Sequence, residues 1–276
     1  MTVVQAITLG LVQGITEFLP ISSIAHLRVV PALLGWSDPG AAFSAVIQLG
    51  TLAAVLVYFA SDMRIMARAV LRGLADGRPW ASQEARLAWF ILLGTLPIGV
   101  CGVTFKRYIV GELRSLYVIA GSLIVLGILL WGAEKKASFR REVKDIGWMD
   151  SQLIGLAQAL ALIPGSSRSG TTMTAAMFLG LTREAAARFS FLLGIPAIGA
   201  AGLFELRDLL KHGLGSAGLT SLMIGILTSA LSGYLAIDLL LRYLRSRTTY
   251  VFVWYRIGLG LLLLGLLTAG VLQPLG

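Results

Sequence analysis

Apolar runs about twenty residues long recur along this chain and restrict its fold more than any other feature. A helix of about 20 apolar residues crosses the hydrocarbon core of a bilayer. Charged residues make up 13% of the chain, against about 25% in a soluble domain, and the mean hydropathy is +0.82. The sequence therefore predicts an all-α membrane protein that crosses the bilayer several times. The predicted spans are 43–60, 86–105, 116–133, 184–204, 217–241 and 251–272.

Two further apolar stretches are too short and too broken to cross a bilayer comfortably. The first covers 2–34 and breaks at Pro20, and the second covers 151–181 and breaks at Pro164. Interrupted segments at membrane depth are tolerated where protein or a water-filled cavity surrounds them, and a pair of them marks the binding site of many transporters. We therefore predict that each stretch is a re-entrant helical hairpin.

The two hairpins belong to an internal repeat. The sequence LPISS at 19–23 resembles IPGSS at 163–167, and an FS pair follows at 43–44 and again at 189–190. Each half then holds a hairpin and three spanning helices, and an odd number of crossings inverts the second half, so the hairpins enter from opposite faces and meet near the midplane. We predict one membrane domain (1–276) with a first repeat (1–133, hairpin 2–34), a cytoplasmic loop (134–150) and a second repeat (151–276, hairpin 151–181).

The charges of the connecting segments predict an orientation. One side carries the Arg-rich loop 62–85, the loop 134–150, Arg242, Arg245 and Arg247, and the other carries Lys106, Arg107, Arg114, Arg207 and Lys211. Cytoplasmic loops collect Lys and Arg, so we place the richer side in the cytoplasm. Both termini and the first hairpin then face outward. The net charge of +9 resides in these short loops, so nucleic acid is not an expected partner.

The first hairpin carries polar and ionisable groups at membrane depth, where such groups are costly and usually functional. Gln13 and Glu17 are four residues apart and share one helix face. After the break a second half-helix can begin with Ser22 or Ser23 as its N-cap, and His26 then lies one turn further on. Glu17, Ser23 and His26 are therefore expected to converge.

The second hairpin suits an anion. A helix that begins after Pro164 presents free N–H groups and the positive end of its dipole. Arg168 adds a permanent charge and a planar fork that binds phosphate oxygens in pairs. Ser167, Ser169 and Thr172 can donate further hydrogen bonds, although Thr172 also suits helix packing. Two helix N-termini directed at one point would suit a diphosphate.

Phosphoryl transfer needs charge neutralisation, a positioned nucleophile and an acid for the leaving group. Arg168 and the helix N-termini meet the first need. Glu17, Ser23 and His26 are the candidate catalytic groups for the others, with His26 either as nucleophile or as general acid. Glu17 can act as base or as a ligand of a divalent cation. Ser22, as a cap, and Gln13 are expected beside the phosphates, with Ser167, Ser169 and Thr172.

At these two stretches the chain resembles the undecaprenyl-diphosphate phosphatase family, also called the bacitracin-resistance protein family. The segment 13–26 follows the family's first motif, (E/Q)-G-x-T-E-F-L-P-x-S-S-x-x-H, and the segment 164–170 follows its second, P-G-x-S-R-S-G. The resemblance extends over nearly the whole chain.

The resemblance implies an enzyme of the bacterial inner membrane that hydrolyses undecaprenyl diphosphate to undecaprenyl phosphate and phosphate. That reaction recycles the lipid carrier of cell-wall sugars. The resemblance also implies a site open to the periplasmic side and a need for Mg²⁺ or Ca²⁺. The functional residues that it implies are Glu17, Ser23, His26, Ser167, Arg168 and Thr172.

One departure and two alternatives qualify this interpretation. Many members of the family have glutamate where this chain has Gln13, which can be neither a base nor an anionic ligand, so more weight falls on Glu17. A transporter or flippase of isoprenoid phosphate lipids would use the same architecture and the same anion site. A second lipid-phosphatase superfamily needs a Lys-x6-Arg-Pro motif, which this sequence lacks. The partners expected are the lipid substrate and the bilayer, with a homodimer left open.

Overall fold

The computed structural model describes residues 1–105, 113, 115–212 and 218–274. Within them the regular structure is helical, apart from a single β-bridge between Arg141 and Leu181. The longer helices are α1 (Val3–Phe18), α2 (Ser23–Leu34), α3 (Gly40–Tyr58), α4 (Ala60–Ala75), α5 (Gln83–Gly94), α6 (Leu96–Thr104), α8 (Leu116–Lys136), α9 (Trp148–Ala159), α10 (Arg168–Phe178), α11 (Arg183–His212), α12 (Leu219–Leu244) and α13 (Tyr250–Thr268). Lys106, Arg107 and Arg114 lie outside the described residues.

Five stretches of the described chain are long and apolar enough to cross a membrane, which makes this a multi-pass membrane protein. They are Gln83–Thr104, Leu116–Lys136, Arg183–Arg207, Leu219–Leu244 and Tyr250–Thr268. The helices α3 and α4 pass the same test together, but they are bent by 75° at the break between them. Each predicted span therefore has a counterpart in the structure, with α3 as the first of them.

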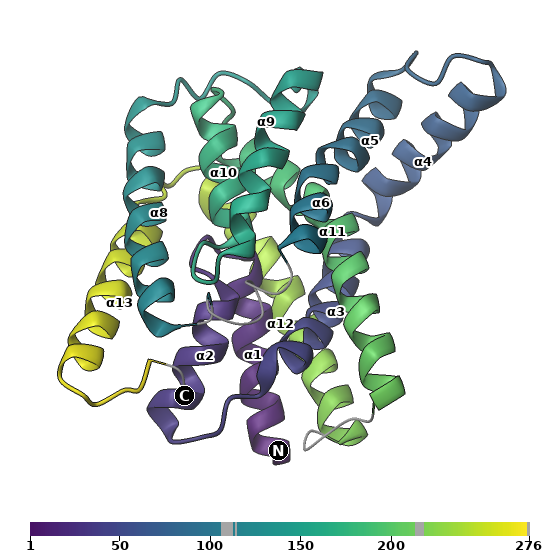
Figure 1. Ribbon diagram of the computed structural model, residues 1–276. Helices are drawn as coiled ribbons and strands as arrows, with labels where there is room; N and C mark the ends of the chain where they lie inside the picture. The colour runs from purple at the N-terminus through teal and green to yellow at the C-terminus, as the bar shows by residue number, and fades with distance from the viewer. Residues whose placement is uncertain (106–112, 114, 213–217, 275–276) are drawn as a thin grey trace.

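The prediction of a connecting loop over 62–85 was wrong for most of its length. Helix α4 occupies 60–75, and only 76–82 separates it from α5. Arg64, Arg68 and Arg72 recur at intervals of four and line the polar face of an amphipathic helix. The pair α4 and α5 projects from the rest of the bundle (Figure 1).

The two predicted hairpins are the pairs α1–α2 and α9–α10. In Figure 1, α1 and α2 lie in the lower half with both chain ends, and α9 and α10 lie in the upper half. The hairpin turns, 19–22 and 160–167, meet between them, where Ser169 Oγ donates a hydrogen bond of 3.0 Å to the carbonyl oxygen of Leu19. The fold thus brings two stretches far apart in sequence to one point in the middle of the bundle.

Small residues let α1 lie directly against α12. A methyl group added at Gly14 would overlap Ser232 Oγ, and it would come within 2.6 Å of the carbonyl oxygen of Ser229. Membrane helices commonly pack through such small residues, because close backbone approach gains van der Waals contact. The helix that carries Gln13 and Glu17 is therefore held against a spanning helix along much of its length.

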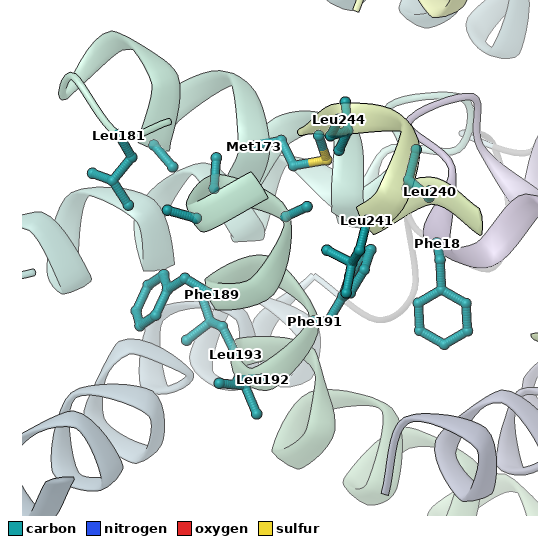
Figure 2. Packing of buried hydrophobic residues seen from close by; sticks show 14 of the residues in the cluster. Phe18, Met173, Leu181, Phe189, Phe191, Leu192, Leu193, Leu240, Leu241 and Leu244 are labelled. Carbon is teal, nitrogen blue, oxygen red and sulfur yellow. The ribbon is translucent and has the colours of Figure 1, made fainter. Parts of the chain in front are cut away.

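The largest apolar cluster lies beside the hairpin turns and joins α1, α10, α11 and α12. Figure 2 shows Phe18 at the end of α1, Met173 of α10, Phe191 of α11 and Leu241 of α12. The rings of Phe18 and Phe191 meet edge to face, with centroids 5.1 Å apart. This packing fixes the end of α1 immediately after Glu17.

Arg141 fixes the outer ends of the second hairpin. Its guanidinium donates to both carboxylate oxygens of Asp150 near the start of α9, at 3.0 and 2.5 Å, and to the carbonyl oxygen of Leu179 after α10, at 2.9 Å. Burial alone would raise the pKa of Asp150, but the hydrogen bonds from Arg141 and from the Gly147 N–H, together with the charge of Arg141, outweigh it and hold the pKa below its ordinary value. The segment 137–147 is therefore a brace for the hairpin as well as a connection.

Candidate functional site

Two serines with unusual backbone conformation cap the second helix of each hairpin. Ser22 precedes α2 with φ of 74°, and Ser167 precedes α10 with φ of 69°. Each hydroxyl accepts from the backbone N–H three residues on, at Ala25 (3.4 Å) and Gly170 (3.1 Å). Positive φ costs a residue with a side chain about 1–3 kcal/mol and clusters at functional sites. The two helix N-termini are thus held in place at the point where the hairpins meet.

Glu17 lies at the centre of the site and is 7% exposed. Its Oε2 accepts from Ser23 Oγ at 2.6 Å and from Gln13 Nε2 at 2.9 Å. Its Oε1 accepts from Arg168 Nη2 at 3.1 Å, so a buried ion pair joins the first hairpin to the second. Of the predicted site residues, Gln13, Glu17, Ser23 and Arg168 therefore form one hydrogen-bonded group.

The side chain of Arg168 lies against helix α11. Its Nη1 donates to the carbonyl oxygen of Ser190 at 3.3 Å, and a methyl group at Gly194 would overlap that same nitrogen. Thr172 Oγ1 lies 2.6 Å from Ser190 Oγ and donates to the carbonyl oxygen of Arg168 at 2.7 Å. Thr172 therefore secures α10 against α11 and has no contact with the Glu17 carboxylate.

We expect Gly194→Ala to lower phosphoryl-transfer activity about a hundredfold, the usual cost of losing one positioned donor. The added methyl displaces the Arg168 guanidinium from Glu17 while leaving the charge in the protein. Gly199→Ala, on the same helix, is the control, because its methyl would meet only Leu52 Cδ2 at 3.7 Å. Equal activity of the two variants under steady-state assay would contradict the placement of Arg168.

Ser167 and Ser169 support the turns. Ser169 Oγ donates to the carbonyl oxygens of Leu19 at 3.0 Å and Glu17 at 3.3 Å, and it lies 3.2 Å from Ser167 Oγ. These bonds add to the hydrogen bonding of the backbone carbonyl groups where α1 ends, where the Leu19 carbonyl also accepts from the Ile21 N–H at 2.8 Å. Ser169 therefore holds the first hairpin against the second, Ser167 caps α10, and a bound anion would meet the N–H groups that they flank.

His26 does not join Glu17 and Ser23, contrary to the expected convergence of the three. Its Nδ1 lies 2.7 Å from the carbonyl oxygen of Ser22, one turn back, and its Nε2 lies 2.6 Å from the hydroxyl of Tyr255 on α13. Both ring nitrogens of His26 are therefore occupied by partners other than the Glu17 carboxylate. Tyr255 is a neighbour that the sequence interpretation missed.

Arg256, next to Tyr255, connects the two hairpin turns and was also missed. It is 0% exposed, and its guanidinium donates to the carbonyl oxygens of Pro20 (2.9 Å), Gly165 (3.1 Å) and Ser166 (2.9 Å). A methyl on Gly170 of the second motif would lie 2.8 Å from its Nη1. The other hydrogen bonds of Arg256 go to the carbonyl oxygens of Leu123 and Ser122, so no carboxylate pairs with it among the described residues. Its charge thus lies beside both helix N-termini and favours an anion between them.

The residues around Glu17 fit a divalent cation only with help from a substrate. Among the described residues no three His, Cys, Asp or Glu side chains come together as a metal cluster. Mg²⁺ is commonly held by one or two carboxylates together with substrate phosphates and water. Glu17 supplies one carboxylate. The buried Oε1 of Gln13 beside it has no hydrogen-bond partner in the described part of the chain, which leaves a neutral oxygen ligand available.

Comparison with known proteins assigns the chain to a family. Residues 6–262 match the family described as bacitracin resistance protein BacA. A Myxococcus xanthus protein named undecaprenyl-diphosphatase is 58% identical over all of this chain and 92% of its own length. Relatives with the same name in Chlorobium phaeovibrioides and Chlorobaculum tepidum are 54% and 49% identical over 99% of this chain and their full lengths. The chain belongs to the bacitracin resistance protein BacA family.

Proposed function

We propose that this protein is an undecaprenyl-diphosphatase that reacts where its two hairpin turns meet. The observation that carries the proposal is the buried group of Glu17, Ser23 and Arg168, which draws on both hairpins. Full-length relatives with that name support the substrate and the reaction. The residues of both family motifs therefore act together at one point.

The contacts suggest what each residue does. The diphosphate binds at the N-termini of α2 and α10, where free N–H groups and the charge of Arg256 favour an anion. Its oxygens compete with Glu17 for the guanidinium of Arg168, which then stabilises charge on the transferring phosphoryl group. Glu17, released from that pair, accepts the proton of the attacking hydroxyl, and Ser23 Oγ is the hydroxyl in place, at 2.6 Å. The bond from phosphorus to the bridging oxygen breaks, Glu17 passes its proton to the leaving undecaprenyl phosphate, and the phosphoryl group stays on Ser23 Oγ. Glu17 then takes a proton from a water molecule, whose oxygen attacks phosphorus. The bond to Ser23 Oγ breaks, the hydroxyl regains its proton from Glu17, and inorganic phosphate leaves.

We further propose that a divalent cation, Mg²⁺ or Ca²⁺, binds at this site together with the diphosphate of the substrate. Glu17 and the free oxygen of Gln13 would hold it together with phosphate oxygens. When bound, it would neutralise charge on the diphosphate. Position 13 is glutamine, so the protein offers the cation only one carboxylate, that of Glu17. The phosphate oxygens of the substrate should therefore contribute more to the affinity for the cation than the protein does.

We also propose that the two halves of the chain form an inverted repeat, and two features of the structure support this. Gln158 lies as far before Ser167 as Gln13 lies before Ser22, and both glutamines are fully buried with polar atoms that lack hydrogen-bond partners among the described residues. This match pairs Pro20 with Gly165, one residue away from the alignment made on sequence. The packing is reciprocal as well: α1 lies on α12 and α9 on α5 and α6, while α3 lies on α11 and α8 on α13.

The orientation follows from the same arrangement. The α4–α5 and α8–α9 connections lie at one end of the bundle and the chain termini at the other (Figure 1). The end with the connections carries more Arg and Lys, so it faces the cytoplasm of a bacterial inner membrane and the first hairpin opens to the periplasmic side. The homodimer stays a prediction.

Phosphate release separates this enzyme from the transporter alternative. The purified protein in detergent should release inorganic phosphate from undecaprenyl diphosphate, with Mg²⁺ or Ca²⁺ increasing the rate and a chelator abolishing it. A transporter releases none, because moving the lipid breaks no phosphorus–oxygen bond. Folded protein that releases no phosphate with either cation, yet moves the lipid across vesicles, would replace hydrolysis by transport.

A further inference from the structure

The two ring nitrogens of His26 have different partners. Nδ1 lies 2.7 Å from the carbonyl oxygen of Ser22, which can only accept, so Nδ1 must carry a proton. In the neutral ring Nε2 then has the free lone pair. The hydroxyl of Tyr255, 2.6 Å away, donates to it. The tautomer of His26 is thus set by a backbone carbonyl on one side and by a phenol on the other.

Tyr255 meets His26 across the boundary between α2 and α13. The two rings are nearly parallel, with an interplanar angle of 10° and centroids 5.6 Å apart. His26 is 7% exposed, whereas Tyr255 is 45% exposed, so the phenol ring forms the outer wall of the histidine's surroundings. Its chain neighbour Arg256 is bonded to Pro20 and Gly165, so the backbone that carries Tyr255 is fixed to both hairpin turns.

We propose that Tyr255 is a positioning residue for phosphoryl transfer, whose hydroxyl donates to Nε2 of His26 and holds the imidazole at the edge of the site. This proposal rests on the proposed function. Tyr255 needs no contact with the substrate, because its hydroxyl acts through the imidazole. The two contacts also explain why His26 makes no hydrogen bond to Glu17 among the described residues, because Ser22 and Tyr255 occupy both of its ring nitrogens.

Replacing Tyr255 by phenylalanine removes the hydroxyl and keeps the stacked ring. In Tyr255→Phe we expect kcat for phosphate release to fall about tenfold while KM stays within about twofold, since the phosphate-binding groups are untouched. Tyr250→Phe, at the start of the same helix, is the matched control and should keep wild-type kcat and KM. A general loosening of α13 would instead raise KM and affect both variants.

Nitrogen NMR gives a second readout that does not depend on activity. The chain has two histidines, His26 and His212, so ¹⁵N-histidine labelling yields few signals, and His212→Gln assigns them. In wild type the Nδ1 of His26 should be protonated and its Nε2 should accept a hydrogen bond. In Tyr255→Phe the Nε2 signal should move downfield, because that hydrogen bond is lost.

The outcomes separate the two claims. Lower kcat, unchanged KM and a shifted Nε2 signal support the positioning role. An active wild type with an equally active Tyr255→Phe, or an Nε2 signal that does not move, overturns the role and leaves the enzyme assignment intact. Wild-type protein that releases no phosphate overturns the proposed function and the positioning role together.

Discussion

Replacing Glu17 by glutamine should slow phosphate release about a thousandfold, within the range that a positioned general base contributes. In the native protein Ser23 Oγ donates to the Glu17 carboxylate at 2.6 Å. The glutamine amide keeps the size of the side chain but cannot take the proton from that hydroxyl. It also loses the ion pair with Arg168. The effect should fall on kcat, because the anion site formed by Arg168 and the helix N-termini remains.

Glu184→Gln is the control for that substitution. Glu184 lies in the first turn of α11, away from the hairpin turns, and pairs with Arg245 at 3.0 Å in a more exposed position. Its loss should leave phosphate release within about twofold of wild type, as expected for an exposed ion pair. If Glu17→Gln kept more than about a tenth of wild-type kcat, Glu17 would not be the base.

Arg168→Lys should lower kcat/KM for phosphate release about a hundredfold, because lysine keeps the charge but loses the planar fork. The native guanidinium reaches Glu17 with Nη2 and the carbonyl oxygen of Ser190 with Nη1. A single ammonium cannot make both contacts and also bind two phosphate oxygens. Both kcat and KM should suffer, in contrast to Glu17→Gln.

Arg188→Lys is the control for Arg168→Lys, because it makes the same replacement at another arginine that lies on α11. Arg188 is partly exposed and pairs with Asp62 at 3.3 Å. Its replacement should change kcat/KM by less than about twofold. Near-normal turnover in Arg168→Lys would contradict the role of the guanidinium and favour a purely structural pair with Glu17.

The residues around the hairpin turns could be predicted from sequence because they are local. Glu17 and Gln13 are one helical turn apart, and the serines follow a break, so their meeting needs little more than helix geometry. The predicted repeat led us to expect that the two hairpins meet, but the ion pair between Glu17 and Arg168 is a finding of the structure. His26 was misplaced because neither the Ser22 carbonyl nor a tyrosine from α13 can be inferred from the hairpin sequence.

Arg256 could have been identified from the sequence as a candidate functional residue. It is a charged residue inside the predicted span 251–272, where charge is costly and usually functional. Tyr255 and Gly194 carried no comparable signal, because aromatic residues are common near membrane surfaces and the chain has 32 glycines. Their importance lies in long-range contacts, with His26 on α2 and Arg168 on α10, that only the folded chain reveals.

The central claim, that both hairpins form one site, is tested most directly by calorimetric titration with a hydrolysis-resistant methylene analogue of an isoprenoid diphosphate. Wild type should bind one analogue per chain. Ser22→Ala, which removes the N-cap of α2 in the first hairpin, and Arg168→Lys in the second should each weaken that same binding about tenfold, since both change groups that form the anion site. Two independent binding events, or binding that only one hairpin's substitution weakens, would show that the hairpins do not share the substrate.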